Sequence, residues 1–365
     1  MVKLLNIIPC LSGGGAEQQL RYLSNELASN GHEVHIAYLY EGKQFGAIND
    51  KISLHKLTAA SNYDIRILFQ IFVLIRNINP DVVQSWIIQS DIFAAIACPL
   101  LKKKWVVRES NAPSLRQGSS FKFFIRRLLM RFANTIISNS MSGYNYWKSV
   151  YPMKNNKLIE NGFPIDDLAM DLKGDVEVQE LDKNIAACLT GTALLFVGRL
   201  EFQKNLDKLI AAISLVKEDG LNLIICGAGS LEHELKDKVK HLDLSNNIFF
   251  IGSVSKNVVY HLMREVDGLV LPSHFEGFPN VVVEAMLNKC PLVVSDIEPH
   301  RAFLDEKSAL FVCHTDEVSI ADGIEQLLQD KNSARLRVEA AYAIAERLSI
   351  KVMVEKYEYV YSNVI

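Results

Sequence analysis

The chain has 365 residues, 49% of them apolar and 22% charged. This composition excludes a disordered protein, and it predicts two domains because one hydrophobic core rarely exceeds about 250–300 residues. The net charge of −3 is divided unevenly: residues 1–165 carry 19 Lys and Arg against 10 Asp and Glu, and the remaining residues carry 20 against 32. We therefore expect the two halves to meet different partners.

The first half alternates short apolar runs with longer amphipathic ones. The run Leu4–Ile8 is too short for a signal-peptide core and is predicted to be the first buried strand. Helical periodicity appears at residues 17–28 and 66–78. The uncharged apolar run in the second segment, Ile67–Ile75, is too short for a membrane span. This alternation is typical of a parallel, doubly wound α/β sheet. The other strand candidates are Val34–Tyr38, Ile52–His55, Val82–Ser85, Trp105–Val107, Thr135–Ser138 and Lys157–Ile159.

A glycine-rich loop follows the first predicted strand. Gly13, Gly14 and Gly15 allow the backbone to approach a phosphate closely, and the helix after them directs its N-terminus toward it. A dinucleotide fingerprint would need Gly or Ala where Gln18 stands. Three interpretations stay open here: a tight turn, an NAD site, and a loop that contacts a sugar diphosphate.

Residues 166–190 break the alternation, because they are polar and acidic with little periodicity. We predict a linker there, between a first domain over residues 1–165 and a second over 191–349, with a terminal helix over 350–365 that packs back on the first. Two such Rossmann-like domains are expected to face each other across a cleft, with ligands at the carboxyl ends of the strands. The strand candidates of the second domain are Leu194–Val197, Leu223–Cys226, Ile248–Ile251, Gly268–Leu271, Leu292–Ser295 and Ala309–Val312.

Two cations follow the first strand of the second domain. Arg199 lies at the predicted strand end and Lys204 at the start of the next helix. The planar fork of an arginine and the point charge of a lysine can together hold a diphosphate. Two solvated charges on a loop are the alternative when this segment is taken alone.

Two glutamates, Glu276 and Glu284, are eight positions apart. Pro279 is expected to open a helix, which leaves Glu276 on the loop before it and Glu284 inside it. Carboxylates accept hydrogen bonds from sugar and ribose hydroxyls, and the free amides of a helix start suit a phosphate. Because this helix is apolar nearly all round, Glu284 needs a partner; the alternative is an exposed helix residue.

The glycine loop, the segment with Arg199 and Lys204, and the segment from Glu276 to Glu284 occur in the order found in family 4 glycosyltransferases, a retaining family of the GT-B fold. Asn161-Gly162 and Gly227-Ala228-Gly229 belong to the same ordered set. The chain resembles that family over both domains. The resemblance implies transfer of a hexose or N-acetylhexosamine from a nucleotide diphosphate sugar, commonly a UDP-sugar, without a metal or another cofactor. It further suggests a lipid-linked oligosaccharide acceptor in surface polysaccharide, O-antigen or lipopolysaccharide assembly.

The resemblance also implies roles for individual residues. Arg199 and Lys204 hold the donor diphosphate, Glu276 contacts the transferred sugar, and Glu284 contacts the ribose. The remaining donor contacts are expected from Gly14, Gly15, Gly252, Val254, Gly277, Phe278, Pro279 and Asn280. No carboxylate cluster has convincing metal-ligand spacing, which agrees with a metal-independent enzyme.

Acceptor contacts are expected in the first domain, from Glu17 in the glycine loop and from Arg108 and Asn111 after a strand. Many members of the family carry a histidine after the fourth strand, and this chain has none there. Gln89 is the candidate for that place. A glutamine can hydrogen-bond a sugar but cannot titrate.

Lys102–Lys104 and Phe121–Arg131 make the first domain basic and mix cations with aromatic and aliphatic residues. This mixture suits peripheral contact with anionic lipid. Together with the resemblance to surface-polysaccharide glycosyltransferases, it implies a cytoplasmic protein at the cytoplasmic face of the inner membrane. An amphipathic core helix with a solvated basic face is the alternative. No nucleic-acid partner is expected, because no stacking motif or binding module is visible.

Three other functions remain open. A sugar-nucleotide epimerase of GT-B fold and a non-catalytic nucleotide-sugar-binding protein share the expected architecture. An NAD oxidoreductase is disfavoured by Gln18.

Overall fold

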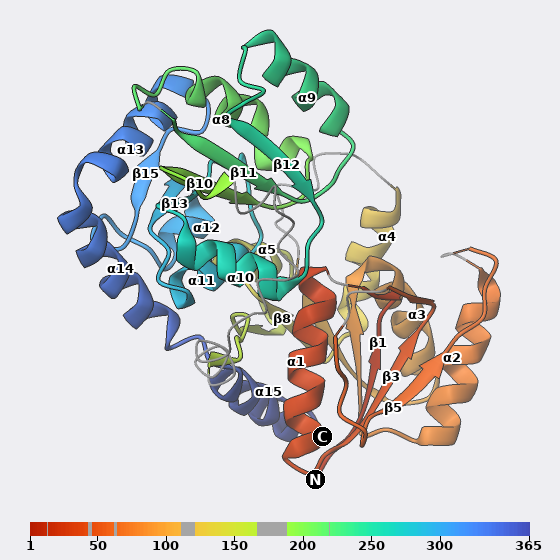
Figure 1. The fold of residues 1–365 in the computed structure, drawn as a ribbon. Helices are drawn as coiled ribbons and strands as arrows, with labels where there is room; N and C mark the ends of the chain where they lie inside the picture. The colour runs from red at the N-terminus through yellow and green to blue at the C-terminus, as the bar shows by residue number, and fades with distance from the viewer. Residues whose placement is uncertain (13, 43–45, 62–63, 111–120, 166–187, 219) are drawn as a thin grey trace. The chain divides into compact units, whose positions relative to one another are not determined.

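A computed structural model describes the chain except for residues 13, 43–45, 62–63, 111–120, 166–187 and 219. The chain divides into two compact units (Figure 1). One comprises Met1–Pro164 with Leu348–Ile365, and the other comprises Ile165–Arg347. Most of the predicted linker lies outside the described residues.

The first unit is built on a parallel sheet with strand order β5-β3-β1-β6-β7-β8-β9. The chain moves outward from β1 to one side and then to the other, so the predicted doubly wound sheet is confirmed. The strands are β1 Lys3–Ile7, β3 Glu33–Tyr38, β5 Ser53–Lys56, β6 Val82–Trp86, β7 Lys104–Glu109, β8 Thr135–Ser138 and β9 Asn155–Leu158, with a small pair β2 Cys10–Leu11 and β4 Tyr40–Glu41. The helices are α1 Gly15–Ser29, α2 Ile65–Ile78, α3 Ile87–Leu100, α4 Phe121–Leu129, α5 Met141–Val150 and α15 Ile350–Val364.

Two cores cover the two faces of this sheet, because successive strand residues point in opposite directions. Leu5 belongs to the core that includes the buried residues of α2 and α3. Leu4 belongs to the other core, with residues of α1 and α15. The hydroxyl of Tyr361 on α15 donates to Gln84 Oε1 at 2.7 Å. The C-terminal helix is therefore an integral part of the first unit.

The second unit has a parallel sheet with strand order β12-β11-β10-β13-β14-β15. Its architecture repeats that of the first unit, as predicted from the alternating pattern. The strands are β10 Ala193–Val197, β11 Asn222–Cys226, β12 Ile248–Gly252, β13 Gly268–Leu271, β14 Leu292–Ser295 and β15 Leu310–Val312. The helices are α8 Leu206–Ile213, α9 Glu232–His241, α10 Lys256–Glu265, α11 Asn280–Leu287, α12 Glu298–Arg301, α13 Glu317–Gln329 and α14 Lys331–Ala345.

Serine side chains explain where three of the helices begin. Ser140, Ser255 and Ser349 each accept a hydrogen bond from the backbone N–H three residues later, at the starts of α5, α10 and α15. Such caps satisfy amides that the helix itself leaves without partners. They place the start of α10 directly after β12.

The basic segment Phe121–Arg131 differs from the expected surface helix in one respect. Helix α4 ends at Leu129, and a 3-10 turn, η2, spans Met130–Phe132. Arg126 points inward, with Nε 2.7 Å from Asp91 Oδ2 and one terminal nitrogen 2.8 Å from Glu109 Oε2. This corrects the inclusion of Arg126 in a membrane-contacting face. The cause is the pair of buried carboxylates, which need a positive partner.

Candidate functional site

The donor residues predicted in the second unit gather where strands of its sheet end. Lys204 Nζ lies 2.5 Å from Glu276 Oε1, and both side chains are largely buried, at 12% and 6% exposure. The same carboxylate oxygen accepts from Ser273 Oγ at 2.7 Å. Its second oxygen accepts from Gln203 Nε2 at 3.3 Å. Glu276 is thus held by three donors from two loops.

Arg199 extends this network toward solvent. Its side chain is exposed, and a guanidinium nitrogen donates to Gln203 Oε1 at 3.1 Å. Gln203 donates in turn to the backbone oxygen of Phe275 at 3.0 Å. The arginine, glutamine, lysine and glutamate therefore form one connected polar array. An exposed arginine beside a buried lysine can approach a diphosphate from two sides.

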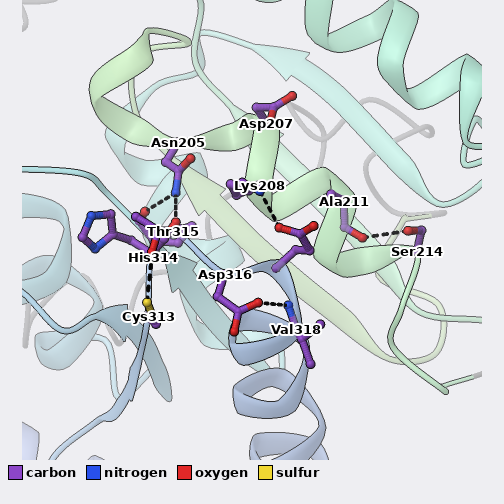
Figure 2. A network of polar contacts seen from close by, with 12 residues as sticks. Asn205, Asp207, Lys208, Ala211, Ser214, Cys313, His314, Thr315, Asp316 and Val318 are labelled. Atoms are coloured by element: carbon purple, nitrogen blue, oxygen red, sulfur yellow. Dashed lines mark hydrogen bonds and ion pairs between the residues drawn. The ribbon is translucent and has the colours of Figure 1, made fainter.

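Asn205 links the loops that follow three strands. Its backbone is left-handed, with φ of 57°, a conformation that Asn tolerates better than most residues. Its Nδ2 donates to the carbonyl oxygens of Pro272 at 3.0 Å and His314 at 2.6 Å. Figure 2 shows this side chain reaching the segment after β15, with the Lys208–Glu317 ion pair nearby. Asn205 thereby fixes the backbone beside Lys204.

Glycines bring two strand-end loops into contact. Gly227 has φ of 143°, and a Cβ there would lie 1.9 Å from the carbonyl oxygen of Gly198. A Cβ at Gly229 would lie 2.3 Å from the carbonyl oxygen of Leu200. Leu200 N–H donates to the carbonyl oxygen of Ala228 at 3.1 Å. The position of Arg199 therefore depends on this glycine pair.

We expect Gly227→Ala to lower the free energy of unfolding by about 1–3 kcal/mol, because the added methyl group displaces a backbone oxygen. Urea denaturation measures the change. Gly220→Ala is the matched control, since Gly220 also has positive φ, at 74°, but has no atom within 4 Å of a Cβ. An equal loss in both variants would mean that strain in φ alone, and not the loop contact, requires Gly227.

Glu284 lies on α11 and is buried, at 6% exposure. It forms an ion pair with Lys256, the first residue of α10. Lys256 is the partner that this glutamate was expected to need, and the sequence pattern did not identify it. Gly252, with φ of 73°, ends β12, and its carbonyl oxygen accepts from Gly227 N–H at 2.8 Å. Val254 is half-buried between β12 and α10.

The segment before α11 surrounds Glu276. Gly277 and Phe278 are half-buried, and the Phe278 ring stacks on Phe303 at 5.7 Å. Pro279 is the N-cap of α11, one residue earlier than a first-turn position, and Asn280 begins the helix. The carbonyl oxygen of Pro279 accepts from Val282 N–H at 3.0 Å.

His300 is a residue of this region that the sequence analysis missed. It is fully buried on α12, and its Nδ1 lies 2.8 Å from the carbonyl oxygen of Ser295. Nδ1 must therefore carry the proton, because a carbonyl only accepts. Nε2 is buried and has no hydrogen-bond partner among the described residues. Burial lowers the pKa of His300, and the charges of Glu276 and Lys204 also act on the ring. No motif marked this histidine, because it comes close to Glu276 and Lys204 only in the folded chain.

We expect His300→Asn to flatten the pH dependence of stability. The unfolded chain titrates this histidine near about 6.5, and its pKa is lower in the folded state. The unfolded state therefore binds the extra proton first, and wild-type stability is lost as the pH falls below about 6.5. Asn can still donate to the Ser295 carbonyl but cannot titrate. Urea unfolding at pH values on both sides of that point measures the slope, and identical slopes would exclude His300 as the source.

In the first unit, Gly14 is the N-cap of α1, which begins at Gly15. A Cβ at Gly14 would lie 2.4 Å from Glu17 Oε2, so the glycine leaves room for this carboxylate. Gln89 lies in the first turn of α3, and its Oε1 is buried with no hydrogen-bond partner among the described residues. Just before it, Ile87 has φ of 72°, an unusual backbone for a β-branched residue.

Arg108 does not face an acceptor, which corrects our expectation. It is 1% exposed, and its guanidinium donates to the Ile159 carbonyl oxygen at 2.7 Å and to Asn161 Oδ1 at 2.6 Å. The guanidinium also lies over the rings of Trp86 and Tyr357. Because successive strand residues point to opposite faces of the sheet, this side chain points toward the core that α15 covers. Asn111 lies outside the described residues.

In the described part of the chain, no group of three or more His, Cys, Asp or Glu side chains could hold a metal ion. None of the helices in that part combines the length and apolarity that crossing a membrane requires.

Residues 13–167 match the family model "Glycosyltransferase Family 4", and residues 178–344 match "Glycosyl transferases group 1". The two models cover nearly the whole chain, in the order of its two units. The chain therefore belongs to the family 4 glycosyltransferases.

Curated relatives extend along the full chain. The GalNAc-alpha-(1->4)-GalNAc-alpha-(1->3)-diNAcBac-PP-undecaprenol alpha-1,4-N-acetyl-D-galactosaminyltransferase of Campylobacter jejuni is 26% identical over 349 residues, 91% of this chain and 90% of the relative. The amylovoran biosynthesis glycosyltransferase AmsD of Erwinia amylovora is 23% identical, over 94% of each chain.

Solved structures share the fold. Anabaena HepE in complex with UDP-glucose superposes with a TM-score of 0.83 at 18% identity, over 100% of both chains. WaaG, a glycosyltransferase involved in lipopolysaccharide biosynthesis, gives a TM-score of 0.74 at 14% identity, over 97% of this chain and 98% of WaaG. The fold is GT-B, as predicted.

Proposed function

We propose that the protein is a retaining glycosyltransferase that moves a hexose or N-acetylhexosamine from a UDP-sugar to a lipid-linked glycan during bacterial surface polysaccharide assembly. The observation that carries this proposal is the buried Lys204–Glu276 pair with Arg199 beside it at the strand ends of the second unit. The curated relatives support the acceptor class, because one is named for an undecaprenyl-diphosphate glycan and another for an exopolysaccharide. HepE, solved with UDP-glucose, supports the donor class.

The polar array suggests how the bond to the leaving group breaks. As the anomeric carbon separates from the phosphate, negative charge grows on the diphosphate. In this proposal Arg199 and Lys204 stabilise that charge, and preorganised groups of this kind supply much of an enzyme's rate enhancement. The acceptor hydroxyl then attacks from the face that the leaving group vacates, and its proton passes to a phosphate oxygen. This route retains the anomeric configuration.

Ligand binding and product analysis test the proposal. A ligand that binds only the folded state raises the melting temperature, so UDP should stabilise the protein more than GDP or NAD does. A panel of nucleotide sugars, followed by mass spectrometry with and without acceptor, should then show hydrolysis or transfer. An isomerised sugar nucleotide without acceptor would instead indicate an epimerase, and binding without turnover would indicate a non-catalytic protein.

We further infer that transfer needs no metal, because two side-chain cations supply the positive charge. Transfer should then continue in excess EDTA. Loss of activity in EDTA that Mg²⁺ restores would contradict this inference.

We also propose that the first unit contacts anionic membrane at the cytoplasmic face of the inner membrane. Phe121, Phe124 and Leu128 on α4 are 74%, 60% and 47% exposed. Helix α3 packs between α4 and α2, whose residues Ile65 and Phe69 are also exposed. Exposed cations accompany these apolar side chains at Lys102, Lys104, Lys122, Arg127 and Arg131, whereas α2, α3 and α4 carry one acidic residue, the buried Asp91.

Vesicle flotation tests this contact. Phosphatidylglycerol-containing vesicles should carry the wild-type protein at low salt and release it at high salt. Phe124→Ser should weaken the binding, whereas Leu336→Ser, at a similarly exposed position of the second unit, should not. Absence of wild-type binding at low salt would remove the membrane proposal and leave the transferase proposal intact.

A further inference from the structure

Three aromatic rings gather beside the donor residues of the second unit. The Phe202 ring stacks on His274, with centroids 4.6 Å apart and planes 24° apart. His314 meets His274 edge-on, with centroids 5.3 Å apart. Phe202 is nevertheless 68% exposed. These three residues form what we call the aromatic platform.

The platform is fixed to the polar array by backbone contacts. Phe202 and Lys204 belong to the same 3-10 turn, η4, which spans Phe202–Lys204. His274 N–H donates to the Gln203 carbonyl oxygen at 2.9 Å. The His314 carbonyl accepts from Asn205, as Figure 2 shows. The backbone of the platform is therefore part of the same loops that carry Lys204 and Glu276.

The chemistry of the platform differs from that of the array. Burial, and then the neighbouring His314, lower the pKa of His274, so this ring is neutral at neutral pH. Ser273, Gln203 and Lys204 offer charge and hydrogen bonds, whereas Phe202 offers a flat apolar face to solvent. Such a face contributes little to folding because it buries little area. A flat exposed ring suits the apolar C–H face of a pyranose.

We propose that the aromatic platform binds a sugar ring of the glycan acceptor, so that the second unit contributes to acceptor recognition as well as to donor binding. The proposal rests on the proposed function. We assign the platform to the acceptor because the donor sugar has hydroxyl partners in the Glu276 array, while the Phe202 face lies open to a ring that arrives from solvent. Stacking on Phe202 would set the acceptor at the side of the donor.

Saturation-transfer NMR tests this assignment. Aromatic protons are saturated in the presence of UDP, and the probes are methyl α-D-glucopyranoside, methyl α-D-galactopyranoside and methyl 2-acetamido-2-deoxy-α-D-galactopyranoside. At least one should receive saturation at its ring C–H protons in the wild type. The signal should fall by about tenfold in Phe202→Ala, as expected for one lost aromatic contact, and should persist in Phe202→Trp. Tyr359→Ala, at a 65% exposed aromatic residue of the first unit, is the matched control.

The outcomes separate the two proposals. UDP affinity should be unchanged in Phe202→Ala, and a parallel loss of UDP binding would instead place the nucleotide on the platform. An undiminished glycoside signal in Phe202→Ala, or no signal from any probe in a wild-type protein that binds UDP, would overturn the acceptor site alone. A wild-type protein that does not bind UDP would contradict the proposed function itself.

Discussion

Lys204→Ala is expected to lower the turnover number by about 10²–10³, the loss typical of removing one preorganised charge-stabilising group. Lys204 is the largely buried cation of the array, and its ammonium lies 2.5 Å from Glu276. The variant loses the charge that we propose to face the leaving diphosphate, and it loses the ion-pair partner of Glu276. We expect Glu276→Ala to nearly abolish transfer as well. Steady-state turnover with a UDP-sugar measures both effects.

Lys208→Ala is the control for this experiment. Lys208 lies one turn further along, on α8, and pairs with Glu317 at 2.5 Å, but both side chains are more than a third exposed (Figure 2). Its turnover should stay close to that of the wild type. The double variant Lys204→Met, Glu276→Gln removes both charges, so neither is left buried without its partner. It should be more stable than Lys204→Ala but should show no more turnover. Wild-type turnover in a folded Lys204→Ala protein would refute the assignment.

The second large effect is expected at Arg126. Arg126→Met should lower the free energy of unfolding by about 3–5 kcal/mol, because it leaves two carboxylates buried without their cation. Asp91 and Glu109 are 0% and 1% exposed. Burial raises the pKa of Asp91, and the positive charge of Arg126 opposes that rise. Urea denaturation followed by circular dichroism measures the change.

Arg127→Met is the matched control, because it removes an exposed cation from the adjacent position of the same helix. A surface substitution of this kind usually changes stability by no more than about 0.5 kcal/mol. Equal losses in the two variants would show that charge on α4, and not the buried pair, stabilises the first unit. Vesicle binding should weaken in Arg127→Met and not in Arg126→Met, because Arg127 is exposed and Arg126 is buried.

Much of the fold was predictable from local patterns. The apolar runs in the middle of each sheet, such as β1 at Lys3–Ile7, are strands because parallel strands buried on both faces need continuous apolar residues. The alternation with helices then requires a parallel sheet. The terminal segment was expected to pack on the first domain, and Tyr357 and Tyr361 do lie in that core.

The charged side chains were harder to place. Arg108 was expected to face an acceptor because it ends a strand, yet it is buried under α15, which is more than 200 residues distant in the chain. Arg126 looked like one cation of a basic face. In both cases the partner that decided the outcome lies on another element, and no local pattern reveals it. Lys256 and His300 were missed for the same reason.

By itself, the sequence determined the alternating architecture, the division into two halves and the glycines and charged residues that mark the strand ends. These depend on the periodicity and backbone preferences of neighbouring residues. Only the tertiary structure decided which lysine faces which glutamate, which arginines are buried, and that Phe202, His274 and His314 meet in one platform. Those outcomes depend on desolvation and close packing between segments far apart in the chain, and a buried charge is stable only where the fold supplies its partner.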